Sequence, residues 1–129
     1  MYFATEYETF KDGLKAFTKN LTDYSIGEMA KDPDRYKGEK VKISVRIKDV
    51  TYTEDGLGIL CTYNPPSGSK KAKTPLYLRL YGYGQDQINE DMVVTIYGTV
   101  TGAETVKTGD GEETRLGILL QYGTYLSSK

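Results

Sequence analysis

The stretch Val41-Lys42-Ile43-Ser44-Val45-Arg46-Ile47-Lys48 alternates apolar and polar residues. A side-chain period of two is typical of a β-strand with one buried face and one face in water. After Asp49 the apolar residues move to the even positions Val50 and Tyr52. Such a change of parity predicts a β-bulge near Lys48–Asp49, at which the strand bends.

Four more strand-like segments follow, at residues 57–63, 76–83, 92–101 and 114–122, and the last is expected to end between Tyr122 and Leu126. Glycine, proline and acidic residues separate them, so residues 64–75 and 102–113 are predicted to be loops, the second with a turn at Asp110-Gly111. Five strands with a break after the third predict an all-β, five-stranded Greek-key barrel of the oligonucleotide/oligosaccharide-binding (OB) type. An SH3-like barrel is the nearest alternative.

The first 39 residues have a helical period instead. Apolar residues recur at spacings of three or four at Tyr7, Phe10, Leu14 and Phe17. They predict a helix over residues 5–19. A second short helix is expected from Ser25 to Lys31, because Ser25 and Glu28 have capping-box spacing and Asp32-Pro33 ends it. We therefore expect a helical extension over residues 1–39 and one OB barrel over residues 40–126.

Two motifs support a family resemblance. Asp32-Pro33-Asp34-Arg35-Tyr36-Lys37-Gly38-Glu39-Lys40-Val41 resembles the N-P-x-K-Y-K-G-K-x-V pattern that begins the first strand of bacterial OB-fold domains of the tRNA-anticodon-like group. The segment 89–100 is similar to their fourth strand, with Glu90 where that pattern often has glycine. The resemblance covers about residues 24–126 and implies a binding barrel without transferring any catalytic residue. Many such proteins are exported proteins, lipoproteins or products of phages and mobile elements.

The first motif also has a structural explanation. Tyr36 is expected to lie over one end of the barrel, and Gly38 is expected to permit the turn into the first strand.

The side-chain inventory excludes most catalysis. Histidine is absent, which removes Ser-His-Asp and Cys-His chemistry and nearly all zinc sites. The single cysteine, Cys61, has the strand parity of Ile59 and Tyr63, so we expect a buried thiol and no nucleophile. The acidic clusters lack the spacing of a calcium loop. We expect no enzyme activity, no cofactor and no metal.

The net charge of −1 conceals two differently charged parts. Residues 41–84 carry 7 basic and 3 acidic residues, whereas residues 85–114 carry 1 basic and 7 acidic residues. Leu78 and Leu80 share one face of the third strand, and the other face carries Tyr77, Arg79, Tyr81 and Tyr83. Basic residues accompany this face on the first strand and the proline-rich loop: Lys42, Arg46, Lys48, Lys70, Lys71 and Lys73.

Binding of single-stranded nucleic acid requires aromatic and basic side chains on one surface, because bases stack on tyrosines and cations neutralise phosphates. We predict a binding module for single-stranded nucleic acid or another anionic polymer. A protein–protein adaptor or inhibitor from a phage, mobile element or cell envelope is the alternative, with the acidic residues 102–113 contributing. A small-ligand or oligosaccharide binder is a third possibility. Outward tyrosines also stabilise cross-strand pairs without any ligand. The oligomeric state is left open.

The compartment is also left open. No stretch of about 18 apolar residues predicts a membrane span. Met1-Tyr2-Phe3-Ala4-Thr5-Glu6 lacks the pattern of a secretory leader. The chain as written is expected in the cytoplasm, and an exported protein or lipoprotein is expected if a leader was removed ahead of Met1.

Overall fold

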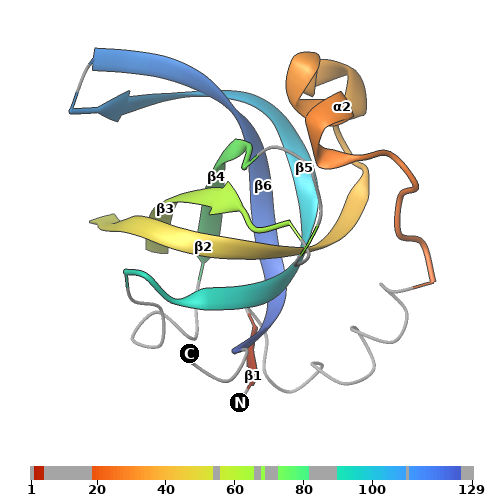
Figure 1. Ribbon diagram of the computed structural model, residues 1–129, viewed down its shortest axis with the longest axis horizontal. Coiled ribbons are helices and arrows are strands. Elements are labelled where there is room, and N and C mark those ends of the chain that lie inside the picture. Colours follow the sequence, from red (N-terminus) through yellow and green to blue (C-terminus); the bar gives the residue numbers. More distant parts are fainter. Residues whose placement is uncertain are drawn as a thin grey trace.

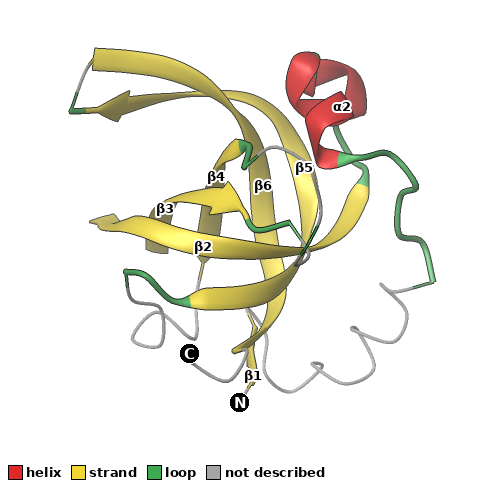
Figure 2. Cartoon of the chain, in the orientation of Figure 1, coloured by secondary structure: helices red, strands yellow, loops and turns green. Residues whose placement is uncertain are grey.

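The computed structural model describes residues 2–4, 19–53, 56–65, 68, 73–81, 90–109 and 111–125. The elements in chain order are β1 (Tyr2–Ala4), α2 (Ile26–Lys31), the 3-10 helix η1 (Pro33–Tyr36), β2 (Lys40–Thr53), β3 (Gly56–Tyr63), β4 (Pro75–Tyr81), β5 (Val93–Thr108) and β6 (Gly111–Tyr125). Strands dominate the described part of the chain (Figure 2). Residues 5–18 of the helix predicted over residues 5–19 lie outside the described residues.

Five of the strands close into a barrel (Figure 1). Strand β2 pairs with β3, β3 with β4, and β5 with both β6 and β2, all antiparallel. Strand β4 pairs with β6 in parallel. Numbered within the barrel, this is a circuit of strands 1-2-3-5-4. The chain is therefore an all-β, OB-fold-like barrel, as the sequence predicted.

The inward faces of the five strands form one hydrophobic core. The apolar positions of the first strand, Val41, Ile43, Val45 and Ile47, are all buried, whereas Lys42 and Arg46 between them are exposed. The other strands contribute Leu57, Ile59, Cys61, Leu76, Leu78, Leu80, Val94, Ile96, Val100, Leu116, Ile118 and Leu120. The alternation in the sequence thus marks correctly which side chains leave water, which is the main favourable contribution to folding.

The predicted bulge in the first strand is also present. The register between β2 and β3 shifts between Ile47 and Asp49. Strand β2 pairs with β5 over residues 40–46 and with β3 over residues 45–53. A single long strand therefore serves two neighbours, and its outward side chains lie on two different parts of the barrel surface.

Helix α2 and helix η1 are part of the barrel core. Ser25 Oγ accepts a hydrogen bond from the Glu28 N–H at 3.1 Å, and the Ser25 N–H donates to Glu28 Oε1 at 3.3 Å, which confirms the predicted capping box. Met29 of α2 and Tyr36 of η1 are buried in the core cluster. Helix η1 packs against β5, and α2 packs against η1 and β6. The extension predicted to be helical also contains a strand, because β1 pairs antiparallel with β6.

Both turns that the motifs predict have left-handed backbone. Gly38, with φ of +91°, precedes β2, and its N–H donates to the Val100 carbonyl at 2.9 Å. Before β5 the corresponding residue is Asp91, with φ of +67°. Aspartate tolerates this conformation better than most side chains. The turn therefore forms with Asp91, although Glu90 stands where the family pattern often has glycine.

The prediction of a loop over residues 102–113 was wrong. Strand β5 continues to Thr108 and β6 begins at Gly111, so these residues form an antiparallel ribbon. We call residues 103–109 and 111–115 the β5–β6 arm, which extends away from the barrel in Figure 1. Nearly every side chain of the arm is exposed or half-buried. It has no apolar face to produce an alternating pattern, so the sequence gives no strand signal there.

Candidate functional site

The outer face of β4 is the part of the surface where the sequence placed its main candidates. Leu76, Leu78 and Leu80 are completely buried, while Tyr77 and Arg79 are half-buried. The predicted alternation of this strand is therefore confirmed, with Tyr77 and Arg79 on the outside of the barrel. Tyr81 is the last residue of β4, and its side chain is not among those described. Tyr83 lies outside the described residues.

The Tyr77 ring extends sideways over strand β3. A Cβ atom built at Gly58 would lie 2.5 Å from Tyr77 Oη and 3.3 Å from Cζ. Any side chain at position 58 would therefore occupy the space of the ring. Gly58 pairs directly with Arg79 in the β3–β4 register. The glycine thus leaves room on β3 for an aromatic side chain that comes from the neighbouring strand.

Arg79 lies between this ring and an acidic side chain. Its guanidinium carbon is 5.2 Å from the centroid of the Tyr77 ring, which is a cation–π distance. Its Nη2 donates to Glu104 Oε1 at 3.2 Å. Glu104 comes from the β5–β6 arm, 25 positions further along the chain. The arm therefore reaches the outer face of β4.

Glu104 has its own supports. Its Oε2 accepts a hydrogen bond from Thr101 Oγ1 at 3.2 Å. A Cβ atom built at Gly117, on β6, would contact Glu104 Cγ. Gly117 pairs with Tyr77 in the parallel β4–β6 register. Glycines on both strands that flank β4 therefore give Tyr77 and Glu104 the space in which they lie.

We call the set Tyr77, Arg79, Thr101 and Glu104 the β4 surface. It combines an aromatic ring, one cation and one carboxylate. The Arg79 side chain keeps 42% of its accessible area and the Glu104 side chain keeps 22%. A ligand can therefore reach the cation from solvent. Such a surface can stack a flat ring and bind an anion.

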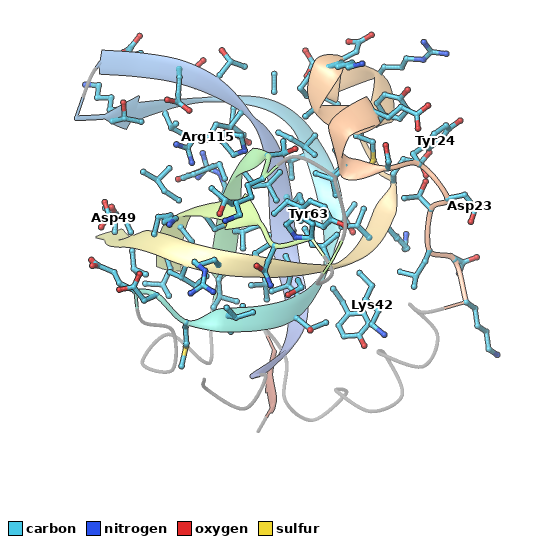
Figure 3. All side chains as sticks on the ribbon, in the orientation of Figure 1. Asp23, Tyr24, Lys42, Asp49, Tyr63 and Arg115 are labelled. Carbon is cyan, nitrogen blue, oxygen red and sulfur yellow. The ribbon has the colours of Figure 1, made fainter. Side chains whose placement is uncertain are left out.

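The basic residues of β2 divide between two parts of the surface. Lys42 stands opposite Tyr97 in the β2–β5 register, and its Nζ is 5.7 Å from the Tyr97 ring centroid. It therefore does not adjoin Tyr77 and Arg79, which lie on β4. Figure 3 shows Lys42 far from Arg115, which belongs to the arm. The structure thus does not bring Lys42 into the cluster that the sequence suggested.

Arg46, Lys48 and Lys73 lie closer to β4. Arg46 pairs with Thr62 of β3, which pairs with the first residue of β4, and its Nη1 donates to the Asp91 carbonyl at 3.2 Å. Lys48 is exposed at the bulge, and Lys73 is exposed two residues before β4. Two strand spacings, about 10 Å, separate β2 from β4. Lys70 and Lys71 lie outside the described residues. Whether these residues bind a ligand stays a prediction.

Arg115 was not among the sequence candidates. Its Nε lies 2.7 Å from Glu113 Oε2, and its Nη1 donates to the carbonyls of Leu76, at 3.2 Å, and Cys61, at 3.5 Å. The two bonds to the backbone carbonyls hold the arm against the barrel. Only the strand register reveals them, so no sequence pattern could have identified this arginine.

Cys61 is completely buried, as predicted. Burial raises the pKa of its thiol above the ordinary range, and the nearby Arg115 charge opposes only part of that rise. The thiol therefore stays protonated and is a poor nucleophile.

The described residues carry no group of three cysteine or carboxylate side chains that could hold a metal ion. No described helix combines the length and the hydropathy of a membrane span.

No protein-family model and no curated protein sequence matches this chain. Among solved structures, the barrel is similar to aspartyl tRNA synthetase from Entamoeba histolytica, with a TM-score of 0.55. The likeness is one of fold. The sequences are 12% identical, and the match covers 88% of this chain but 23% of the synthetase chain.

Proposed function

We propose that this chain is a non-catalytic OB-fold module that binds single-stranded nucleic acid through the outer face of β2, β3 and β4. The observation that carries the proposal is the Tyr77–Arg79 pair. An aromatic ring lies over Gly58, and a guanidinium 5.2 Å from the ring centroid stays accessible to solvent. A base can stack on the ring while the guanidinium binds the adjoining phosphate.

The fold supports the same ligand class. OB barrels bind oligonucleotides and oligosaccharides on the face of their second and third strands, which are β3 and β4 here. The similar synthetase acts, by its name, on tRNA. The absence of histidine and the buried, protonated Cys61 support a role in binding without catalysis.

A protein adaptor or inhibitor is the second candidate. The β5–β6 arm favours it, because Glu112, Glu113 and Thr114 are exposed along a ribbon that extends from the barrel. If the protein is such an adaptor, oligonucleotides will not bind even at low salt. The experiment below therefore separates the two candidates.

The test is a titration of fluorescent single-stranded oligonucleotides at 20 and 200 mM salt, with affinity measured by anisotropy. For about three phosphate contacts, the tenfold rise in salt should weaken binding about a hundredfold. Arg79→Gln should weaken binding at 20 mM salt by about fivefold, because a charged phosphate contact is lost.

The matched control is Lys31→Gln. It removes the same charge from an exposed residue of α2, a helix that is not part of the proposed surface. Its affinity should match that of the wild type. If the wild type does not bind at 20 mM salt, or if both variants lose affinity equally, the proposed site is wrong.

A further inference from the structure

The ion pair between Arg79 and Glu104 lies within the proposed binding surface. Its Nη2–Oε1 distance is 3.2 Å, and both side chains are partly accessible. A carboxylate and a phosphate oxygen make the same charge-assisted bond to a guanidinium. Glu104 therefore holds a donor that an incoming phosphate would use.

A hydroxyl group positions the Glu104 carboxylate, and a glycine leaves room for the rest of its side chain. Thr101 Oγ1 donates to its other carboxylate oxygen at 3.2 Å, and Gly117 leaves the space that its Cγ occupies. Ion pairs between two freely moving surface side chains lose much of their strength to side-chain entropy. Here the carboxylate is positioned before Arg79 meets it, so less of that entropy remains to be lost.

We infer that Glu104 is an intramolecular competitor that takes the place of a phosphate on Arg79 and lowers the affinity of the site. This inference rests on the proposed function and adds a control of it. A phosphate that binds the Nη2 donor of Arg79 must first displace the carboxylate. Binding is then weaker and less dependent on salt than the number of basic residues suggests.

The other ion pair of the arm provides a contrast. Glu113 lies 2.7 Å from Arg115, whose side chain keeps 13% of its accessible area and donates to two backbone carbonyls. Arg115 is therefore already committed to the barrel and is poorly accessible to a phosphate. Removal of the Glu113 charge should not release a donor for the ligand. Glu113 and Glu104 thus carry the same charge on the same ribbon in two different roles.

The experiment compares Glu104→Gln with Glu113→Gln in oligonucleotide titrations at several salt concentrations. Glu104→Gln should tighten binding about two- to fivefold, the range of a partly exposed ion pair. The slope of log K against log salt should become steeper by about 0.7, because one more phosphate charge is neutralised without compensation. Glu113→Gln should change neither quantity.

A double-mutant cycle separates competition for Arg79 from general repulsion between Glu104 and the ligand. In an Arg79→Gln background, Glu104→Gln should have no further effect on affinity if the two compete directly. Thr101→Val, which removes the hydroxyl that holds the carboxylate, should give a smaller increase in affinity than Glu104→Gln. Thermal melting of each variant confirms that the barrel remains folded.

The outcomes are distinct. If the wild type binds and Glu104→Gln binds no more tightly, the competitor role is wrong while the proposed function stands. It is also wrong if Glu113→Gln has the same effect or if the gain persists without Arg79. If the wild type does not bind at 20 mM salt, the proposed function itself fails, whatever the Glu104→Gln variant does.

Discussion

Arg79 with Tyr77 and Lys42 with Tyr97 are both cation–tyrosine pairs on the outside of one barrel. Their distances are similar, 5.2 and 5.7 Å from the cation to the ring centroid. The two pairs arise differently. Lys42 and Tyr97 stand opposite each other on β2 and β5, so the strand register alone brings them together. Such cross-strand pairs stabilise a sheet by about 0.2–1 kcal/mol and need no ligand to explain them.

Tyr77 and Arg79 lie two positions apart on a single strand, and strand pairing does not explain their arrangement. The Tyr77 ring needs Gly58 on β3, and Glu104, the ion-pair partner of Arg79, needs Gly117 on β6. A glycine in a strand interior reduces stability by about 0.5–1 kcal/mol relative to alanine. The β4 surface therefore costs stability that the Lys42–Tyr97 pair does not. This difference is the reason for assigning binding to β4.

The largest expected difference between the two pairs comes from removing each ring. Tyr77→Leu should weaken oligonucleotide binding about tenfold, because stacking of a base on an aromatic side chain contributes about 1–3 kcal/mol. Tyr97→Leu should change the affinity less than about twofold. Anisotropy titrations at one low salt concentration measure both values. Leucine keeps the outer face of each strand apolar and leaves the cation in place.

Equal losses of affinity in the two variants would show that the ring on β5 binds as well, and the distinction between the two pairs would then disappear. Urea unfolding is the control for stability. Both variants should unfold within about 1 kcal/mol of the wild type, as expected for outward side chains.

The sequence predicted the parts of the fold that have a buried and an exposed face. The period of two at residues 41–47, the parity change at Lys48–Asp49 and the alternation of residues 76–80 all describe side chains whose burial the barrel fixes. The capping box of Ser25 and Glu28 is equally local. In each case the physical cause lies within a few neighbouring residues, so the pattern can be recognised without knowledge of the fold.

The contacts that complete the β4 surface are not local. Glu104 meets Arg79 only because the arm is a ribbon and because β4 pairs with β6 in a particular register. The arm itself was predicted as a loop, since backbone pairing holds it without an apolar face. The sequence also could not show that the bend of β2 turns Lys42 toward β5. The sequence therefore identified Tyr77 and Arg79. It identified neither Glu104, which contacts Arg79, nor the point at which the surface around them ends.

A smaller effect is expected from filling the space under the Tyr77 ring. Gly58→Ala places a methyl group 2.5 Å from Tyr77 Oη, so the ring must shift. Oligonucleotide affinity should fall about threefold, less than in Tyr77→Leu, because the displaced ring can still contact a base. Gly27→Ala is the control, since a Cβ atom there has nothing within 4 Å. Unchanged affinity in Gly58→Ala would mean that the position of the ring over β3 is not needed for binding.

The smallest effect is expected at the other cation. Lys42→Gln should change oligonucleotide affinity less than about twofold, and unfolding free energy should fall by about 0.5 kcal/mol as the exposed cation–π contact is lost. Arg79→Gln should lower the affinity clearly, and its unfolding free energy should fall at least as far as that of Lys42→Gln, because a closer cation–π contact and the ion pair with Glu104 are both lost. Titration and urea unfolding of the two variants in parallel measure both quantities. If Lys42→Gln weakens binding as much as Arg79→Gln, the ligand crosses the bend of β2 and reaches β5. The binding surface would then include both cation–tyrosine pairs, and Lys42 would belong to it as the sequence predicted.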